Sequence, residues 1–462
     1  MKKEDFKNKN VVILGFGLEG ESTTNFLLEN GAKAFVVDVR SRDKFEEEKI
    51  SDFENKGVSF MFDSYPRTFE NFDLVVRSPG IRLSSNVIEK AKSEGKEITS
   101  STKIFFDLCP CKIIGVTGTK GKSTTATLIY EMLKSGGIDA YLGGNVGKPP
   151  LDFLNDLKID SKVVLELSSF QLQDLNKSPQ IAVFLMVTSE HLDYHRDINE
   201  YIEAKRNILR YQGPDDFAIL NKDYPASNES DVHTHGQLYC VSREQQVEQG
   251  CFVRDGYIWL KIGTREEQIM PTSEVLLAGK HNLENVCAAI LAATIAGAHA
   301  QTIITVLKNF KGLEHRLEFV GEHHGIKFYN DSLATIPEAV IEGIEALGED
   351  VETLIAGGYD RDLDYRELGK YLSDSKIRTL ILFPATGEKI WESLCVEVPN
   401  ESLRPKKFDV ASMKEAVLTA YEHTNPGKIC LMSPGAASFN MFKNYKERGE
   451  QFKKEVENLS SS

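Results

Sequence analysis

The sequence has no apolar run long enough to cross a membrane and no excess of positive charge. A bilayer-spanning helix needs about 20 mostly apolar residues in succession, and no such run occurs in the 462 residues. Lys and Arg number 55 against 69 Asp and Glu, which gives a net charge of −14. This balance argues against nucleic acid or an anionic membrane as the main partner.

Cysteine is too scattered to form a disulfide framework. The seven cysteines are odd in number, and reduced thiols in a cytoplasmic protein are the simplest interpretation. Cys109 and Cys111 flank a proline, but no second Cys or His pair has the spacing of a zinc site. The N-terminus is polar and lacks the apolar core of a signal peptide, so we expect a cytoplasmic protein.

The run GVTGTKGKSTT at 115–125 is the most informative stretch of the chain. It follows an apolar strand and leads into a predicted helix over 123–133. Gly118 and Gly121 allow a tight turn whose N–H groups point at a phosphate. Lys122 supplies a charge for the terminal phosphates, and the Ser123 hydroxyl suits Mg²⁺. The alternative is an ordinary strand–helix turn, but the pattern favours a site for ATP or GTP, although its first glycine is displaced from the usual spacing.

The N-terminal segment has the outline of a dinucleotide-binding fold. A strand over 11–14 is followed by G-x-G-x-x-G at 15–20, a helix, and a second strand that ends at Asp38. Asp38 and Arg40 either hold a ribose and a phosphate or cap the edge of the sheet. A further strand over 72–76 leads into the turn 77–80. NAD is the obvious ligand, but a chain with its own phosphate loop can use this fold for another nucleotide.

The middle segment, from about residue 111, places polar residues at the ends of predicted strands. Glu166 ends a strand over 161–166, where a metal-binding partner of Ser123 is expected. His191 and His195 could share zinc, although one histidine facing Mg²⁺ or phosphate is the better interpretation. Lys205 begins an amphipathic helix and, from the pattern alone, is a solvated surface lysine. Asp255-Gly256 predicts a β-hairpin.

The C-terminal segment alternates strands and helices. Strands are predicted over 326–329, 353–356, 379–383 and 429–432, and polar loops follow several of them. In an open parallel sheet that edge holds ligands. The length favours about three domains, and the three sets of polar loops suggest a cleft between them.

Eight segments, in order along the chain, resemble the Mur ligase family. They are GVTGTKGKSTT at 115–125, LELSSFQL at 165–172, HLDYH at 191–195, YIEAKRNI at 201–208, GKHNLEN at 279–285, GLEHR at 312–316, NDSLAT at 330–335 and SPGAASFNMFKNYKERG at 433–449. The resemblance implies an α/β protein of three domains. These are a Rossmann-like domain for a UDP-linked substrate (1–108), a central P-loop ATPase-like domain (109–312) and a C-terminal Rossmann-like domain for the amino acid (313–462).

The resemblance also implies a reaction, and the likeness is strongest to the branch that adds D-glutamate to UDP-N-acetylmuramoyl-L-alanine. The substrate carboxylate would attack ATP to form an acyl phosphate, and the incoming amine would then form an amide. Such a step in peptidoglycan precursor synthesis requires ATP and Mg²⁺, and positioning and charge stabilisation supply most of the catalysis. We expect a cytoplasmic monomer that binds neither nucleic acid nor membrane.

The residue roles that the resemblance implies fall into four groups. The catalytic residues are Lys122, Glu166, His191 and Lys205, and the Mg²⁺ ligands are Ser123, Glu166, His191 and Lys205, the last as a carbamate. The ATP-binding residues are Gly118, Thr119, Lys120, Gly121, Lys122, Ser123, Thr124, Thr125, Asn282, Asn285, Arg316 and Asp331. The UDP-substrate residues, which replace the NAD interpretation, are Gly17, Asp38, Arg40, Ser78, Gly80, Asn145, Ser168 and Gln171. The amino-acid residues are Thr335, Arg361, Ser438 and Tyr445.

Two positions depart from the family pattern and leave alternatives open. Lys120 stands where Asn is common, and Leu333 stands where D-glutamate ligases usually have Lys. The Asp-Asn-Pro-Arg motif of the diaminopimelate-adding branch is absent. Because a cation is missing at Leu333, addition of another acidic amino acid, such as L-glutamate, is the nearest alternative. A dinucleotide-dependent oxidoreductase and a non-catalytic nucleotide-binding module are more distant ones.

Overall fold

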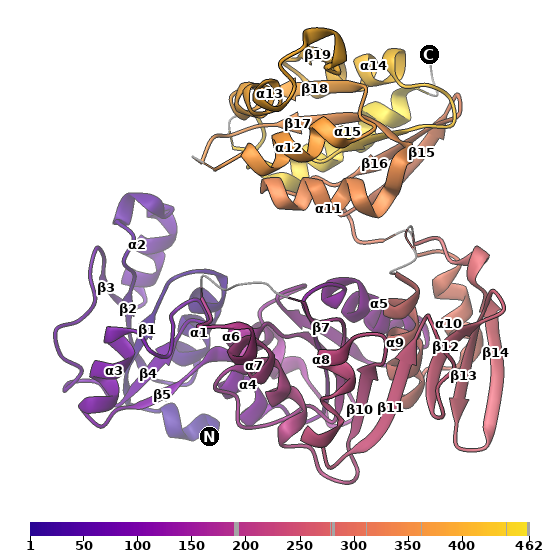
Figure 1. Cartoon of the computed structure of the whole chain (residues 1–462). Helices are drawn as coiled ribbons and strands as arrows, with labels where there is room; N and C mark the ends of the chain where they lie inside the picture. Colours follow the sequence, from indigo (N-terminus) through magenta and orange to yellow (C-terminus); the bar gives the residue numbers. More distant parts are fainter. Residues whose placement is uncertain are drawn as a thin grey trace. The chain divides into compact units, whose positions relative to one another are not determined.

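Three β-sheets, built mainly of parallel strands, carry the fold (Figure 1). The computed structural model describes residues 1–188, 194–277, 279, 282–310, 312–361, 363–439 and 441–459. Two sheets lie in a first unit, Met1–Val275 with Leu283–Lys308, and the third lies in a second unit, Leu276–Asn282 with Asn309–Ser462. The α/β class expected from the sequence is confirmed.

The first sheet has five parallel strands in the order β3-β2-β1-β4-β5. The strands are β1 (Asn10–Leu14), β2 (Lys33–Val37), β3 (Ser59–Met61), β4 (Leu74–Arg77) and β5 (Glu97–Thr99). The helices are α1 (Leu18–Glu29), α2 (Glu47–Asn55), α3 (Asn86–Ser93) and α4 (Ser101–Leu108). Successive side chains of β1, from Val11 to Leu14, are all at most 1% exposed. Both faces of the sheet are therefore covered, as the unbroken apolar run requires.

The second sheet has nine strands in the order β14-β13-β12-β11-β10-β9-β6-β8-β7, of which the β12–β13–β14 end is antiparallel. The strands are β6 (Lys112–Thr117), β7 (Ala140–Gly144), β8 (Lys162–Glu166), β9 (Ile181–Phe184), β10 (Phe217–Asn221), β11 (Gln237–Ser242), β12 (Gly250–Arg254), β13 (Tyr257–Ile262) and β14 (Arg265–Pro271). The helices are α5 (Lys122–Ser135), α6 (Ser169–Leu172), α7 (Ile198–Arg210), α8 (Pro225–Asn228), α9 (Asn282–Ile295) and α10 (Ala300–Leu307). The predicted hairpin is confirmed, because β12 and β13 pair across Asp255 and Gly256, both at positive φ.

The third sheet has six strands in the order β15-β16-β20-β17-β18-β19. The strands are β15 (Glu318–His323), β16 (Ile326–Asn330), β17 (Val351–Gly357), β18 (Thr379–Phe383), β19 (Lys406–Asp409) and β20 (Ile429–Met432). The helices are α11 (Pro337–Leu347), α12 (Arg366–Asp374), α13 (Thr386–Glu397), α14 (Met413–His423) and α15 (Tyr445–Asn458). The four predicted strands are confirmed. The two edge strands were not predicted, because β15 and β19 are rich in charged residues and only partly buried.

Arg77 joins the first sheet to the second within the first unit. Its guanidinium is fully buried and donates to the backbone carbonyls of Pro79 and Ile81 at 3.0 and 2.7 Å. On the other side it pairs with Asp174 Oδ1 at 2.9 Å and donates to the Phe170 carbonyl at 3.1 Å. A buried cation with these acceptors fixes the turn after β4 against the segment that follows β8.

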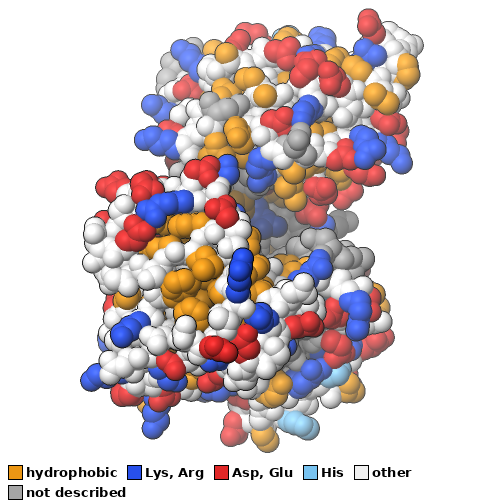
Figure 2. Space-filling model, turned by 90° about the vertical axis from the view of Figure 1, so that its left-hand side faces the viewer, with side chains coloured by type: hydrophobic (Ala, Val, Ile, Leu, Met, Phe, Trp, Pro, Cys, Tyr) orange, Lys and Arg blue, Asp and Glu red, His pale blue; other side chains and the backbone are white. Residues whose placement is uncertain are grey.

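The face shown in Figure 2 carries positive and negative side chains side by side, with no large area of one charge. Lys and Arg side chains are interspersed with Asp and Glu, and apolar side chains gather in one area of the first unit. Throughout the part of the chain that the structure describes, no helix combines the length and the apolar character needed to cross a membrane.

We expect Arg77→Met to lower the free energy of unfolding of the first unit by on the order of 3 kcal/mol, because it leaves Asp174 without its cation. Urea unfolding followed by Trp259 fluorescence, in a Trp391→Phe background, measures this unit. Arg82→Met, which removes an exposed arginine from the same turn, is the control and should change little. Equal effects of the two substitutions would contradict the bridging role of Arg77.

Candidate active site

The phosphate loop lies where β6 ends and α5 begins, as predicted. Gly118 has a φ of 155° and Gly121 a φ of 86°, a region of backbone space that favours glycine. A Cβ at Gly121 would lie 2.1 Å from Asn285 Oδ1, so the loop touches α9 closely. Residues 118–121 therefore form a tight turn that leads into the first turn of α5, with Asn285 beside it. The first-turn amides of α5 suit an anion.

Lys205 lies beneath this loop and is not the surface lysine that the helical pattern predicted. Its side chain is about 1% exposed, and Nζ donates to the Gly118 carbonyl at 2.8 Å. Nζ also lies 4.5 Å from the centre of the Tyr201 ring. The pattern did contain a signal, because Tyr201, Lys205 and Ile208 fall on one stripe of α7 and all three are buried.

Glu166 supplies a buried carboxylate at the end of β8, next to β6. Its Oε2 is closed to solvent and has no hydrogen-bond partner in the described part of the chain. A buried carboxylate oxygen without a donor is costly, and a bound cation would satisfy it. Ser123, at the start of α5, is half-buried. Hard oxygen donors of this kind fit Mg²⁺.

The structure does not test a shared zinc site of the two histidines. His191 lies outside the described residues. His195 is buried, and its Nε2 lies 2.9 Å from Ser169 Oγ. His195 therefore packs against α6 within the fold of the second sheet.

A cavity of about 470 Å³ brings together five of the eight predicted UDP-substrate residues. Its lining includes Gly17, Asp38, Arg40, Ser78 and Asn145. Asp38 accepts hydrogen bonds from the Phe16 N–H at 2.8 Å and from Arg40 Nη2 at 2.8 Å. Burial alone would raise the pKa of Asp38, but Arg40 and the backbone N–H groups hold it below its usual value.

The other three predicted UDP-substrate residues lie outside the lining of this cavity. Gly80 is in the turn that Arg77 holds. Ser168 caps α6 and accepts from the Gln171 N–H at 3.2 Å. The Gln171 amide donates to Glu19 Oε1 at 2.6 Å, which links α6 to the glycine-rich turn before α1. Asn145, which does line the cavity, lies next to the end of β8, because its N–H donates to the Glu166 carbonyl at 3.1 Å.

In the second unit, the loops after β16, β17 and β20 are tied to one another. The Ser433 hydroxyl donates to Asp331 Oδ2 at 2.8 Å, and the Gly435 N–H donates to the Ala334 carbonyl at 3.0 Å. The Gly357 N–H donates to the Pro434 carbonyl at 2.8 Å. The polar loops therefore meet at the carboxyl edge of the third sheet, where ligands bind in folds of this kind.

The predicted amino-acid residues lie on these loops or at the helix that follows them. Arg361 is exposed, and its Nη2 donates to the Thr335 carbonyl at 2.7 Å. Ser438 is buried, and the Tyr445 carbonyl accepts from the Ser332 hydroxyl at 2.8 Å. The three remaining ATP-site predictions, Asn282, Arg316 and Asp331, also belong to the second unit.

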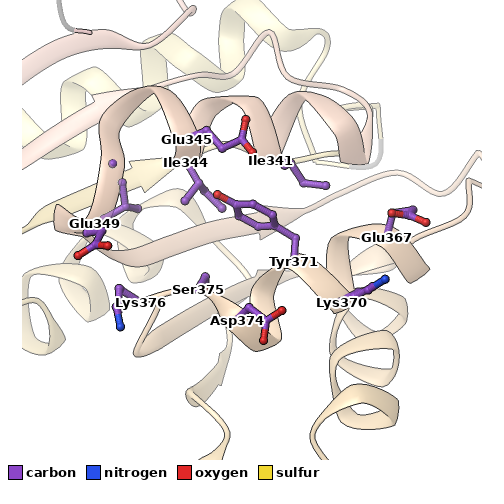
Figure 3. A pocket seen from close by; sticks show the side chains of 12 residues that line it. Ile341, Ile344, Glu345, Glu349, Glu367, Lys370, Tyr371, Asp374, Ser375 and Lys376 are labelled. Atoms are coloured by element: carbon purple, nitrogen blue, oxygen red, sulfur yellow. The ribbon is translucent and has the colours of Figure 1, made fainter. Parts of the chain in front are cut away.

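A separate hollow of about 610 Å³ lies between α11 and α12 in the same unit. Figure 3 shows Tyr371 beside Ile344 and Ile341, with Glu345 and Asp374 around them. Val351, the first residue of β17, also lines the hollow. The hollow therefore lies at the opposite edge of the sheet from the polar loops. None of the predicted site residues lines it.

Family models match the chain in three consecutive segments. Residues 9–100 match a model described as Mur ligase MurD-like, N-terminal domain, residues 116–293 match the Mur ligase middle domain, and residues 315–435 match the Mur ligase, glutamate ligase domain. These segments contain most of each of the three sheets.

Curated relatives match the chain along nearly its whole length. The chain is 39% identical to a UDP-N-acetylmuramoylalanine–D-glutamate ligase of Acetivibrio thermocellus, over 99% of this chain and 98% of the relative. It is 37% identical to the enzyme of the same name from Clostridium acetobutylicum, over 98% of this chain and 97% of the relative. A crystal structure of UDP-N-acetylmuramate–alanine ligase from Thermotoga maritima is similar in fold, with 17% identity, 98% and 100% coverage of the two chains and a TM-score of 0.53.

Asp331 gives the site a pH-dependent stability. Burial raises its pKa to about 7, against the opposing effect of the Ser433 hydroxyl and the Leu317 N–H. Because the folded-state pKa lies above the unfolded value of 3.8, the protonated form stabilises the fold below about pH 4. This stabilisation is lost as the pH rises to about 7.

We therefore expect the free energy of unfolding of the unmodified chain to fall between about pH 4 and pH 8, by a few kcal/mol at most. The Asp331→Asn variant cannot ionise at this position and should not show this fall. Urea unfolding followed by Trp391 fluorescence in a Trp259→Phe background measures the second unit. Asp374→Asn, on the exposed side of α12, is the matched control. If the curves for Asp331→Asn and the unmodified chain run parallel across this range, Asp331 does not ionise as described.

Proposed function

The chain belongs to the Mur ligase family, and from this premise we propose that it joins D-glutamate to UDP-N-acetylmuramoyl-L-alanine at the expense of ATP. The relatives that match nearly its whole length carry the name of this activity. The structural observation that carries the proposal is the hydrogen bond from the Asn145 N–H to the Glu166 carbonyl. This bond holds Asn145, which lines the UDP-substrate cavity, against the backbone of Glu166, the last residue of β8 next to β6.

We propose three domains, 1–108 for the UDP-linked substrate, 109–312 for ATP and 313–462 for the amino acid. The first sheet and the second pack together through Arg77, which supports treating the UDP-substrate and phosphate sites as one surface. The reaction is a cytoplasmic step of peptidoglycan precursor synthesis.

In the proposed reaction the carboxylate of UDP-N-acetylmuramoyl-L-alanine attacks the γ-phosphorus of ATP, and ADP leaves. The amine of glutamate then attacks the acyl phosphate, so that an amide forms and phosphate is released. Lys122 lies at the loop and compensates the negative charge of the transferring group. The N–H groups from Gly118 to Thr125 bind the phosphates, with Asn285, Asn282, Arg316 and Asp331 as the remaining ATP-binding residues.

Ser123, Glu166, His191 and carbamylated Lys205 are the proposed ligands of Mg²⁺. The orphaned Oε2 of Glu166 supports this assignment, and so does the position of Lys205 Nζ, 2.8 Å from the Gly118 carbonyl. Bound Mg²⁺ supplies charge neutralisation at the phosphates. Carbamylation adds CO₂ to the Lys205 amine with loss of a proton and turns a cation into an anionic oxygen donor at the same place.

Thr335, Arg361, Ser438 and Tyr445 are the proposed contacts of the incoming amino acid. A guanidinium such as that of Arg361 suits a carboxylate by paired hydrogen bonds. Leu333 is 39% exposed on the same loop and offers no charge there. This position is the specific reason to keep addition of another acidic amino acid, such as L-glutamate, as the second candidate.

Release of phosphate from ATP with UDP-N-acetylmuramoyl-L-alanine should require D-glutamate in a panel of D- and L-amino acids. Arg361→Met should raise the KM for D-glutamate on the order of 100-fold, because a charge-assisted contact is lost. Arg366→Met, which removes an exposed arginine five residues along the chain, is the control. Release with L-glutamate alone would contradict the D-glutamate assignment, and release with no amino acid of the panel would overturn the ligase assignment.

Lys205→Ala should lower kcat by a factor on the order of 10²–10³, because an anionic oxygen donor for the metal is removed. Added short carboxylic acids should restore part of the activity by occupying the vacated space. Lys162→Ala removes a lysine of the same sheet whose Nζ donates to the Asp160 carbonyl, and it should retain full activity with no response to the acids. A Lys205→Ala enzyme that stays inactive at every acid concentration counts against the carbamate.

A further inference from the structure

Glu19 is a carboxylate in the UDP-substrate cavity that none of the roles above uses. It lies in the first turn of α1 and belongs to the lining of the cavity. Its Oε1 accepts from the Gln171 amide at 2.6 Å. Its Oε2 is closed to solvent and has no hydrogen-bond partner among the described residues.

The charged neighbours of Glu19 are already engaged with other groups. Arg77, whose charge acts on Glu19, pairs with Asp174 at 2.9 Å. Across the cavity, Arg40 pairs with Asp38 at 2.8 Å. On α1 itself, Glu21 pairs with Lys49 at 2.9 Å. Glu19 is therefore an acid held by a neutral amide, with no ion pair of its own in the described part of the chain.

The surroundings of Glu19 are built to hold an anion. The glycine-rich turn 15–20 precedes α1, and the turn is tight, since a Cβ at Gly20 would lie 2.1 Å from the Gly15 carbonyl oxygen. N–H groups at a helix N-terminus after such a turn bind phosphate. Two like charges about 5 Å apart repel by roughly 3 kcal/mol at an effective dielectric constant near 20. An ionised Glu19 and a diphosphate cannot share this cavity without that penalty.

Burial already favours the uncharged form of Glu19. Desolvation raises the pKa of its carboxyl group, while the Gln171 amide and Arg77 act in the opposite direction and do not cancel the effect. An anion in the cavity would raise this pKa further. A neutral carboxylic acid has one O–H donor, and the orphaned Oε2 is the atom that can carry it.

We propose that Glu19 is a neutral acid when the UDP-linked substrate is bound, because an ionised carboxylate in the cavity lining would repel the diphosphate, so that binding takes up one proton from solvent. The inference rests on the proposed function, since it needs a nucleoside-diphosphate ligand in this cavity. It makes Glu19 a residue of the cavity that weakens substrate binding as the pH rises. The glycine-rich turn alone has no such dependence.

Isothermal titration of the full chain with UDP-N-acetylmuramoyl-L-alanine, without ATP, tests the assignment between pH 6 and pH 8.5. The diphosphate of this ligand is a diester and does not titrate in that range. Titrations in two buffers of different ionisation enthalpy count the protons taken up. For the unmodified chain we expect uptake that approaches one proton at the upper end, with a Kd that rises up to about tenfold per pH unit.

Glu19→Gln keeps the shape and a donor but cannot ionise, so its Kd should be independent of pH and its proton uptake zero. Glu21→Gln, two residues along α1 and paired with Lys49 outside the cavity lining, should behave as the unmodified chain. Binding by the unmodified chain without proton uptake would overturn the role of Glu19, as would uptake that persists in Glu19→Gln. Absence of binding at every pH would overturn the proposed function and this assignment with it.

Discussion

The contact between the buried amine of Lys205 and the carbonyl of Gly118 is the interaction on which the rest of the site depends. A lysine side chain that is about 1% exposed is costly unless it is paired or chemically changed. Here it is held by α7 directly under a turn that glycine makes possible. The neighbouring strand β8 ends at Glu166, which has a buried oxygen without a partner in the described part of the chain. The fold therefore places a buried lysine and a buried carboxylate at the carboxyl ends of neighbouring strands, where the proposed phosphates and Mg²⁺ would bind.

A buried polar atom without a hydrogen-bond partner also occurs at the UDP-substrate cavity. Glu19 and Glu166 each present a buried oxygen that no described residue satisfies. Glu19 lies on α1, beside the first sheet, and Glu166 ends β8 of the second sheet; the Gln171 amide and the Arg77 guanidinium hold these parts of the first unit together. Buried polar groups are normally satisfied, and exceptions concentrate at functional sites. These two oxygens belong to residues at the predicted ligand sites, whereas the hollow of Figure 3 lies at the opposite edge of its sheet from the polar loops.

The fold was largely predictable because its strands are buried on both faces and end in polar turns. The phosphate loop, the glycine-rich turn and the Asp255–Gly256 hairpin each have a local signature that the structure confirms. The edge strands β15 and β19 have no such signature, because edges need fewer apolar residues. The amphipathic pattern signals the burial of Lys205 only through its place on the stripe of Tyr201 and Ile208, and its contact with a loop more than 80 residues earlier depends on the packing of α7. Arg77 and Glu19 have partners nearly 100 or more residues away, and only the tertiary structure brings these together.

The central claim is that the substrate carboxylate itself attacks ATP at this loop. It is tested most directly with UDP-N-acetylmuramoyl-L-alanine labelled with ¹⁸O in both carboxylate oxygens, incubated with the enzyme, ATP, Mg²⁺ and D-glutamate. Mass spectrometry of the released phosphate follows the label. The account predicts one ¹⁸O atom in each phosphate, because the bridging oxygen of the acyl phosphate leaves with the phosphorus. Phosphate without label would contradict it, since water and not the carboxylate would then have attacked ATP.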